Sequence, residues 1–218
     1  MRWPRGDLGV RGLSIRHVLL DADGVLQRRP GGWEDAFVGF VGSAHATALL
    51  TEMFEAEKPA VRGDADILEI LATILARYGA ATDAEIVFDT VWQRIELPEP
   101  SHELLRRLRA SGLGVHLGTN QTLRRAAYMR AELGYDDLFD VSCYSAEMGV
   151  SKPEAAYFQI AVDRIGASPG EVLFVDDTLP NVEAARQVGL VAVHWHMREG
   201  LAALLERFAE HDVVLATA

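Results

Sequence analysis

The stretch that decides the fold class is residues 17–25, which read His-Val-Leu-Leu-Asp-Ala-Asp-Gly-Val. An apolar run that ends abruptly in acidic residues and a glycine predicts a short buried strand followed by a sharp turn. Two runs of the same form follow, over residues 114–118 and 172–175. A further strand is predicted over residues 190–195 and a weaker one over 139–144.

Amphipathic helical patterns separate these strands. They cover residues 102–110, 123–133, 154–165, 181–188 and 201–208. Glycines follow several of them, where a left-handed residue commonly ends a helix: Gly112, Gly134, Gly166 and Gly189. Apolar strands that alternate with helices predict an α/β protein with a doubly wound parallel sheet covered by helices on both faces.

Residues 28–97 interrupt this alternation. The segment contains only helical periodicity, over residues 33–41, 45–57, 66–78 and 83–95, and a proline-rich return follows it. We interpret residues 28–97 as a small helical domain inserted after the first strand, and call it the cap. The α/β core then comprises residues 15–27 and 98–218, and residues 1–14 form an N-terminal extension.

Composition limits the possible partners. The chain has 218 residues and a formal net charge of -11, which argues against nucleic acid and anionic membranes as partners. The single cysteine excludes an intrachain disulfide and a cysteine-based zinc cluster. The N-terminus carries no apolar run of signal-peptide length, and the longest uncharged stretch, residues 36–51, is shorter than the roughly 20 apolar residues of a membrane span. We therefore expect a cytoplasmic protein, either a monomer or a homodimer.

Polar side chains gather where the predicted strands end. Ligands bind at the carboxyl ends of the strands in open parallel sheets, so these residues should lie together. Each alone is an ordinary helix cap or turn residue, but their joint occurrence at successive strand ends is hard to obtain by accident. Converging carboxylates require a cation, and oxygen ligands favour Mg²⁺. The residues are Asp21, Asp23, Thr119, Asn120, Asp176 and Asp177, with Lys152 in a loop nearby.

Four ordered motifs resemble those of the haloacid dehalogenase (HAD) superfamily. Residues 21–25 resemble its first motif, residues 118–120 its second, Lys152-Pro153 its third and residues 175–181 its fourth. The inserted cap resembles that of the subfamily whose cap lies between motifs one and two. The closest likeness is to sugar-phosphate phosphatases and to the phosphatase domain of bifunctional epoxide hydrolases. Dehalogenases are disfavoured, because they lack an acid where Asp23 stands.

The resemblance implies a role for each residue. Asp21 is the expected nucleophile and a metal ligand, and Asp23 is the expected acid and base, which also binds the metal through its backbone carbonyl. Asp177 is expected to bind the metal directly, Asp176 either directly or through a water molecule, and Asn181 is expected to orient a metal-bound water. The expected phosphate-binding residues are Thr119, Asn120 and Lys152, and in the cap Arg62 is a candidate contact to the rest of the substrate.

We therefore expect a Mg²⁺-dependent phosphatase that hydrolyses a small phosphorylated metabolite, such as a sugar phosphate, through an aspartyl-phosphate. A phosphomutase of the same superfamily is the alternative enzyme. A signalling receiver domain uses similar residues, but it predicts no inserted helical segment and leaves Asp23 without a role. A binding protein without activity fits poorly with a complete set of reactive residues.

Overall fold

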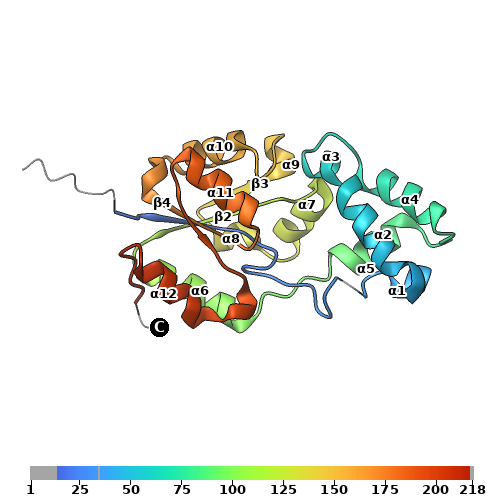
Figure 1. Cartoon of the computed structure of the whole chain (residues 1–218), viewed down its shortest axis with the longest axis horizontal. Helices are drawn as coiled ribbons and strands as arrows, with labels where there is room; N and C mark the ends of the chain where they lie inside the picture. Colours follow the sequence, from blue (N-terminus) through green and yellow to red (C-terminus); the bar gives the residue numbers. More distant parts are fainter. Residues whose placement is uncertain (1–13, 34, 217–218) are drawn as a thin grey trace, which may run out of the picture.

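A five-stranded parallel sheet forms the centre of the computed structural model, which describes residues 14–33 and 35–216. The strand order is β3-β2-β1-β4-β5, so the first strand lies in the middle (Figure 1). The strands are β1 (His17–Leu20), β2 (Gly114–Thr119), β3 (Val141–Tyr144), β4 (Val172–Asp176) and β5 (Val191–His194). The predicted doubly wound α/β fold is confirmed.

Helices bury both faces of this sheet. Side chains alternate along a strand, so Val18 and Leu20 pack on one face and Leu19 on the other. The first face is covered by α6 (Glu99–Ala110), α7 (Leu123–Ala131), α8 (Tyr135–Leu138) and α12 (Leu201–Ala209). The second is covered by α10 (Ala155–Ile165) and α11 (Leu179–Val188). This double burial explains why the strands read as uninterrupted apolar runs.

Some local elements differ from the prediction. The single-turn helices α8 and α9 (Ser145–Met148) were not predicted, because one turn is too short to produce a periodic pattern. The helix predicted from residue 33 begins only at α1 (Val38–Val41). Before it the Ala36 N–H donates a hydrogen bond to the Trp33 carbonyl at 3.0 Å.

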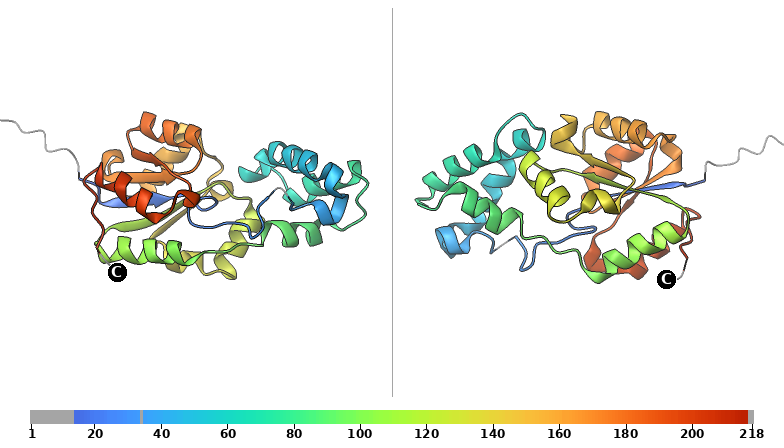
Figure 2. Two further views of the ribbon diagram at one scale, coloured as in Figure 1. Left: turned by 60° about the horizontal axis from the view of Figure 1, so that its bottom comes forward. Right: turned by 180° about the vertical axis from the view of Figure 1, so that it is seen from behind.

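The cap has a hydrophobic cluster of its own. Its members include Phe37, Leu49, Leu71, Phe88 and Trp92. The cap helices lie to one side of the sheet in both views of Figure 2. Besides α1 they are α2 (Ser43–Ala56), α3 (Lys58–Val61), α4 (Ile67–Arg77) and α5 (Ala84–Trp92). A signalling receiver domain would not contain an inserted helical segment of this kind, so the structure disfavours that alternative.

Hydrogen bonds and ion pairs join the cap to the core at several places. The linkers pair as a short antiparallel bridge, in which Arg28 and Glu96 exchange backbone hydrogen bonds of 3.0 and 2.9 Å and form a side-chain ion pair. At the far side, the Ser145 hydroxyl donates to the Val61 carbonyl at 2.6 Å. The bridge lies beside the expected domain boundaries at residues 28 and 97, but the division into two domains stays a prediction.

Residues 1–13 of the expected N-terminal extension lie outside the described residues. Within the described part of the chain, no helix has both the length and the apolar composition needed to cross a membrane.

Candidate active site

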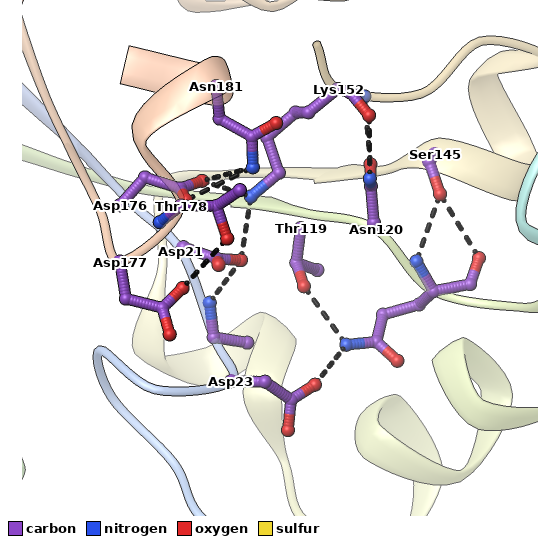
Figure 3. Close-up of polar contacts among 12 residues, drawn as sticks. Asp21, Asp23, Thr119, Asn120, Ser145, Lys152, Asp176, Asp177, Thr178 and Asn181 are labelled. Atoms are coloured by element: carbon purple, nitrogen blue, oxygen red, sulfur yellow. Dashed lines mark hydrogen bonds and ion pairs between the residues drawn. The ribbon is translucent and has the colours of Figure 1, made fainter. Parts of the chain in front are cut away.

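The sheet positions the predicted site residues at one edge. Leu20 is in register with Leu117 of β2 and with Val175 of β4, so Asp21, Thr119 and Asp176 emerge side by side where these three strands end. Figure 3 shows these side chains converging, together with Lys152. The structure thus brings together residues that are more than a hundred positions apart in the sequence.

Three carboxylates form a compact cluster. Oxygen atoms of Asp21, Asp176 and Asp177 all lie within 4.8 Å of one another. The ammonium of Lys152 lies 2.8 Å from Asp21 Oδ1 and 2.7 Å from Asp176 Oδ2, and is the counter-charge bonded inside the cluster. One ammonium cannot neutralise three carboxylates, so this donor set fits a hard divalent cation such as Mg²⁺.

The pKa values of the cluster express the same charge imbalance. Burial raises the pKa of Asp21 to about 8, and the charges of Asp176 and Asp177 add to this rise while Lys152 opposes it. Burial and the neighbouring Asp176 also raise the pKa of Asp177. Burial alone would lower the pKa of Lys152, but Asp176 and Asp21 raise it, so the ammonium stays charged. A bound cation would favour the ionised form of Asp21, which is the nucleophilic form.

Asp176 and Asp177 occupy different environments. Asp176 is fully buried, and its two oxygens accept hydrogen bonds from Lys152, from the Thr178 N–H at 2.8 Å and from the Asn181 amide at 3.0 and 3.1 Å. The side chain of Asp177 is 25% exposed and faces the cleft, so its oxygens are more accessible to an ion. Asn181 therefore fixes Asp176, while its predicted contact to a metal-bound water stays a prediction.

Asp23 lies apart from the carboxylate cluster. Arg125 donates two hydrogen bonds to its carboxylate, at 2.5 and 2.9 Å, and the side-chain amides of Gln27 and Gln121 donate at 3.0 and 2.9 Å. Burial would raise the pKa of Asp23, but the Arg125 charge and these hydrogen bonds lower it below its usual value. The carboxylate is thus held ionised, and the predicted metal contact of the Asp23 backbone carbonyl stays a prediction.

The predicted phosphate-binding residues surround the same edge. Thr119 is buried, and its hydroxyl oxygen accepts a hydrogen bond from Gln121 at 3.0 Å, which leaves the hydroxyl hydrogen available for a ligand. The side chain of Asn120 makes two hydrogen bonds of 2.9 Å to the backbone N–H and C=O of Lys152. Asn120 therefore holds the lysine loop in place, and a direct contact of Asn120 to substrate stays a prediction.

Arg62 lies away from these groups, where α3 ends. Its guanidinium is 3.5 Å from Asp64 and 3.7 Å from Glu154, so it connects the cap to the core. Arg62 is not among the described residues that line the cleft beside Asp21. Its proposed contact to substrate stays a prediction.

A cleft of about 820 Å³ opens above the carboxylates. Its walls include Asp21, Lys152 and Asp177 from the core, and Trp33 and Phe54 from the cap. Sequence reasoning identified the acids and the lysine but missed Arg125, Gln121 and Phe54, and it favoured a packing role for Trp33 over contact with substrate. Gln121 directly follows Thr119-Asn120, and Arg125 lies in the first turn of α7, so their closeness in sequence to the second motif was a signal that could have been used.

Comparison with known proteins supports the same family. A family model described as haloacid dehalogenase-like hydrolase matches residues 15–189. A sesquiterpene phosphatase from Aspergillus oryzae is 38% identical over 104 residues, which are 47% of this chain and 52% of that protein, so the match spans about half of this relative. An enolase-phosphatase from Bradyrhizobium sp. is 27% identical over 211 residues, covering 84% of this chain and 86% of the relative.

Among solved structures, a HAD family enzyme from Bacteroides thetaiotaomicron, in complex with magnesium and inorganic phosphate, superposes with a TM-score of 0.69 at 20% identity. The alignment covers 88% of this chain and 99% of that enzyme. At this level of identity the likeness establishes the fold.

Proposed function

The chain belongs to the haloacid dehalogenase-like hydrolase family, and from this premise we propose that it is a Mg²⁺-dependent phosphatase that forms an aspartyl-phosphate. The substrate is a small phosphorylated metabolite, such as a sugar phosphate. The observation that carries the proposal is the position of Asp21, which contacts Lys152 at 2.8 Å within a cluster of three carboxylates. Two relatives with phosphatase names support an action on phosphate esters.

The ion would be held by the carboxylates of Asp21 and Asp177 and by the backbone carbonyl of Asp23, with Asp176 fixed beside them by Lys152 and Asn181. When bound, it would neutralise these carboxylates and withdraw charge from the phosphoryl oxygens.

The residues of the chain account for two chemical steps. In the first, a carboxylate oxygen of Asp21 forms a bond to phosphorus while the bond from phosphorus to the leaving oxygen breaks. Lys152 and the Thr119 hydroxyl offset the charge on the phosphoryl oxygens, and protonated Asp23 gives its proton to the leaving oxygen. In the second, the Asp23 carboxylate takes a proton from the water that attacks the phosphorus, and Asp21 is released.

The hydrogen bonds of Asp23 bear on the first step. A carboxylate clamped by Arg125 is in the form needed to activate water, and its lowered pKa disfavours the protonated form. We therefore propose that Asp23 leaves Arg125 and turns toward the leaving group before it donates a proton.

A screen of phosphorylated metabolites with Mg²⁺, scored by phosphate release, tests the proposal. EDTA should abolish release, added Mg²⁺ should restore it, and Ca²⁺ should substitute poorly because its larger coordination shell misplaces the nucleophile. Isomerisation without release would support the mutase instead. Full activity in EDTA would contradict the metal site.

A further inference from the structure

A second cavity, of about 160 Å³, adjoins Asp23 on the side away from the carboxylate cluster. Asp23, Trp33, Phe54 and Asn120 line both this cavity and the larger cleft, so the two spaces meet at these residues. Under the proposed function, the leaving oxygen must come within hydrogen-bond distance of the Asp23 carboxyl to take its proton. The alcohol attached to that oxygen therefore extends past Asp23 toward Trp33 and Phe54.

The cap presents aromatic surface at this junction. The rings of Trp33 and Phe54 pack edge to face with centroids 5.6 Å apart, and Trp92 lies behind Trp33 at 6.3 Å. Phe54 is 39% exposed and is the one exposed large apolar side chain among the described residues that lines either cavity. A ligand with an apolar face would cover Phe54 and remove that surface from water.

The positive charges on this side are already engaged. Arg125 is bonded to Asp23 and to the Trp92 carbonyl, and Arg28 forms a two-bond ion pair with Glu96. The buried guanidinium of Arg29 donates to backbone carbonyls. Like Arg28 and Arg29, His196 and Arg198 line only the larger cleft, and His196 lies 4.0 Å from Asp177 of the carboxylate cluster.

A carboxyl group completes the smaller cavity. Glu57, at the end of α2, lines it beside Trp33 and Phe54. Burial raises the pKa of Glu57 to about 7, although the charge of Arg125 opposes this rise, so above pH 7 the carboxyl is mostly ionised and would repel a carboxylate or phosphate placed there. Among the described residues that line this cavity, the one cation is Arg125, which is already bonded to Asp23.

We infer that the cavity formed by Trp33, Phe54 and Glu57 receives an uncharged alcohol with an apolar face. The enzyme should thus prefer phosphate monoesters of such alcohols and reject those whose alcohol carries a carboxylate or a second phosphate. This inference rests on the proposed function, and it names the substrate class of the same site.

Matched substrates test the inference. In the wild-type enzyme with Mg²⁺, kcat/KM for para-methylbenzyl phosphate should exceed that for para-carboxybenzyl phosphate about tenfold or more, because the two differ chiefly in charge. Glu57→Lys should reverse this preference and Glu57→Gln should reduce it. Phe54→Ser should lower kcat/KM for the methyl compound several-fold, whereas Ile86→Ser, which is 58% exposed on the cap but outside both cavities, should not.

Acetyl phosphate distinguishes a failure of this inference from a failure of the phosphatase proposal, because its leaving group is too small to reach the aromatic residues. If acetyl phosphate is hydrolysed but the matched pair is not discriminated, the inference about the alcohol is wrong and the phosphatase proposal stands. An unchanged preference in Glu57→Lys would also overturn the inference. If neither acetyl phosphate nor the benzyl esters are hydrolysed, the phosphatase proposal fails and the inference fails with it.

Discussion

Arg125 controls the state of Asp23 at the scale of single residues. The guanidinium is buried and makes two hydrogen bonds to the Asp23 carboxylate and one of 2.8 Å to the Trp92 carbonyl of the cap. It therefore contacts both the proposed proton donor and the last residue of the final cap helix.

Replacing this arginine should change the pH dependence of catalysis. Arg125→Gln removes the charge that lowers the pKa of Asp23, so the pKa assigned to Asp23 in a pH profile of kcat should move upward. The second step uses the Asp23 carboxylate that Arg125 holds in place, and loss of a charge-assisted hydrogen bond costs about 1.5–3 kcal/mol, so hydrolysis of the intermediate should slow roughly ten- to a hundredfold. Arg124→Gln is the matched control, because that neighbour pairs with Glu85 instead. A uniform loss of activity at every pH would mean that Arg125 serves only folding.

His116 is a second buried group with a pH-dependent consequence. Burial, together with the nearby His17 ring, lowers its pKa to about 4 from 6.5. Between these two values the unfolded chain binds a proton that the folded chain does not, so stability should rise with pH across this window. The shift corresponds to about 3 kcal/mol at most.

Chemical denaturation at pH 4.5 and pH 7 should measure this effect. His116→Val should reduce the difference in unfolding free energy between the two pH values, and His211→Gln, at an exposed site, should leave it unchanged. Equal pH dependence in wild type and His116→Val would show that His116 does not carry the effect.

At the scale of elements, the loop after β1 depends on Gly24. Its φ is +81°, and a Cβ added there would lie 2.2 Å from Asp177 Oδ2. Gly24→Ala should therefore displace Asp177 and weaken Mg²⁺ affinity about tenfold or more, in addition to the roughly 1–2 kcal/mol cost of a left-handed alanine.

Calorimetric titration of Mg²⁺ should separate these two effects. Gly166→Ala is the control, since its φ is +75° with open space around the added atom, so it should lose stability without losing Mg²⁺ affinity. Unchanged Mg²⁺ affinity in Gly24→Ala would argue against Asp177 as a ligand.

Features that depend on local sequence could be predicted, whereas contacts between distant segments could not. The strands were predictable because burial on both faces leaves an uninterrupted apolar run, and the acids were predictable because they directly follow those runs. The hydrogen bonds from Arg125 to Asp23 were not predictable, because they join residues 102 positions apart and because an arginine on a helix usually faces water. The aromatic pair of Trp33 and Phe54 depends on how cap helices pack, which helical periodicity alone does not specify.

At the scale of the whole molecule, the chemistry and the selection of substrate have separate origins. The reactive side chains extend from the ends of strands that the sheet holds in register. The cap supplies Trp33, Phe54 and Glu57, which line the smaller cavity beside Asp23. Changes in the cap should therefore alter the choice of alcohol while leaving hydrolysis of acetyl phosphate intact.

The central claim is that Asp21 becomes phosphorylated during turnover. The Asp23→Asn variant should accumulate this intermediate from acetyl phosphate, because that leaving group needs little help from an acid while hydrolysis of the intermediate needs a base. Acid quenching, borohydride reduction and peptide mass spectrometry then locate the phosphorylated residue. The account predicts conversion of Asp21 to homoserine, and no conversion in Asp21→Asn. Modification of another aspartate, or phosphate release with no modified residue at all, would contradict it.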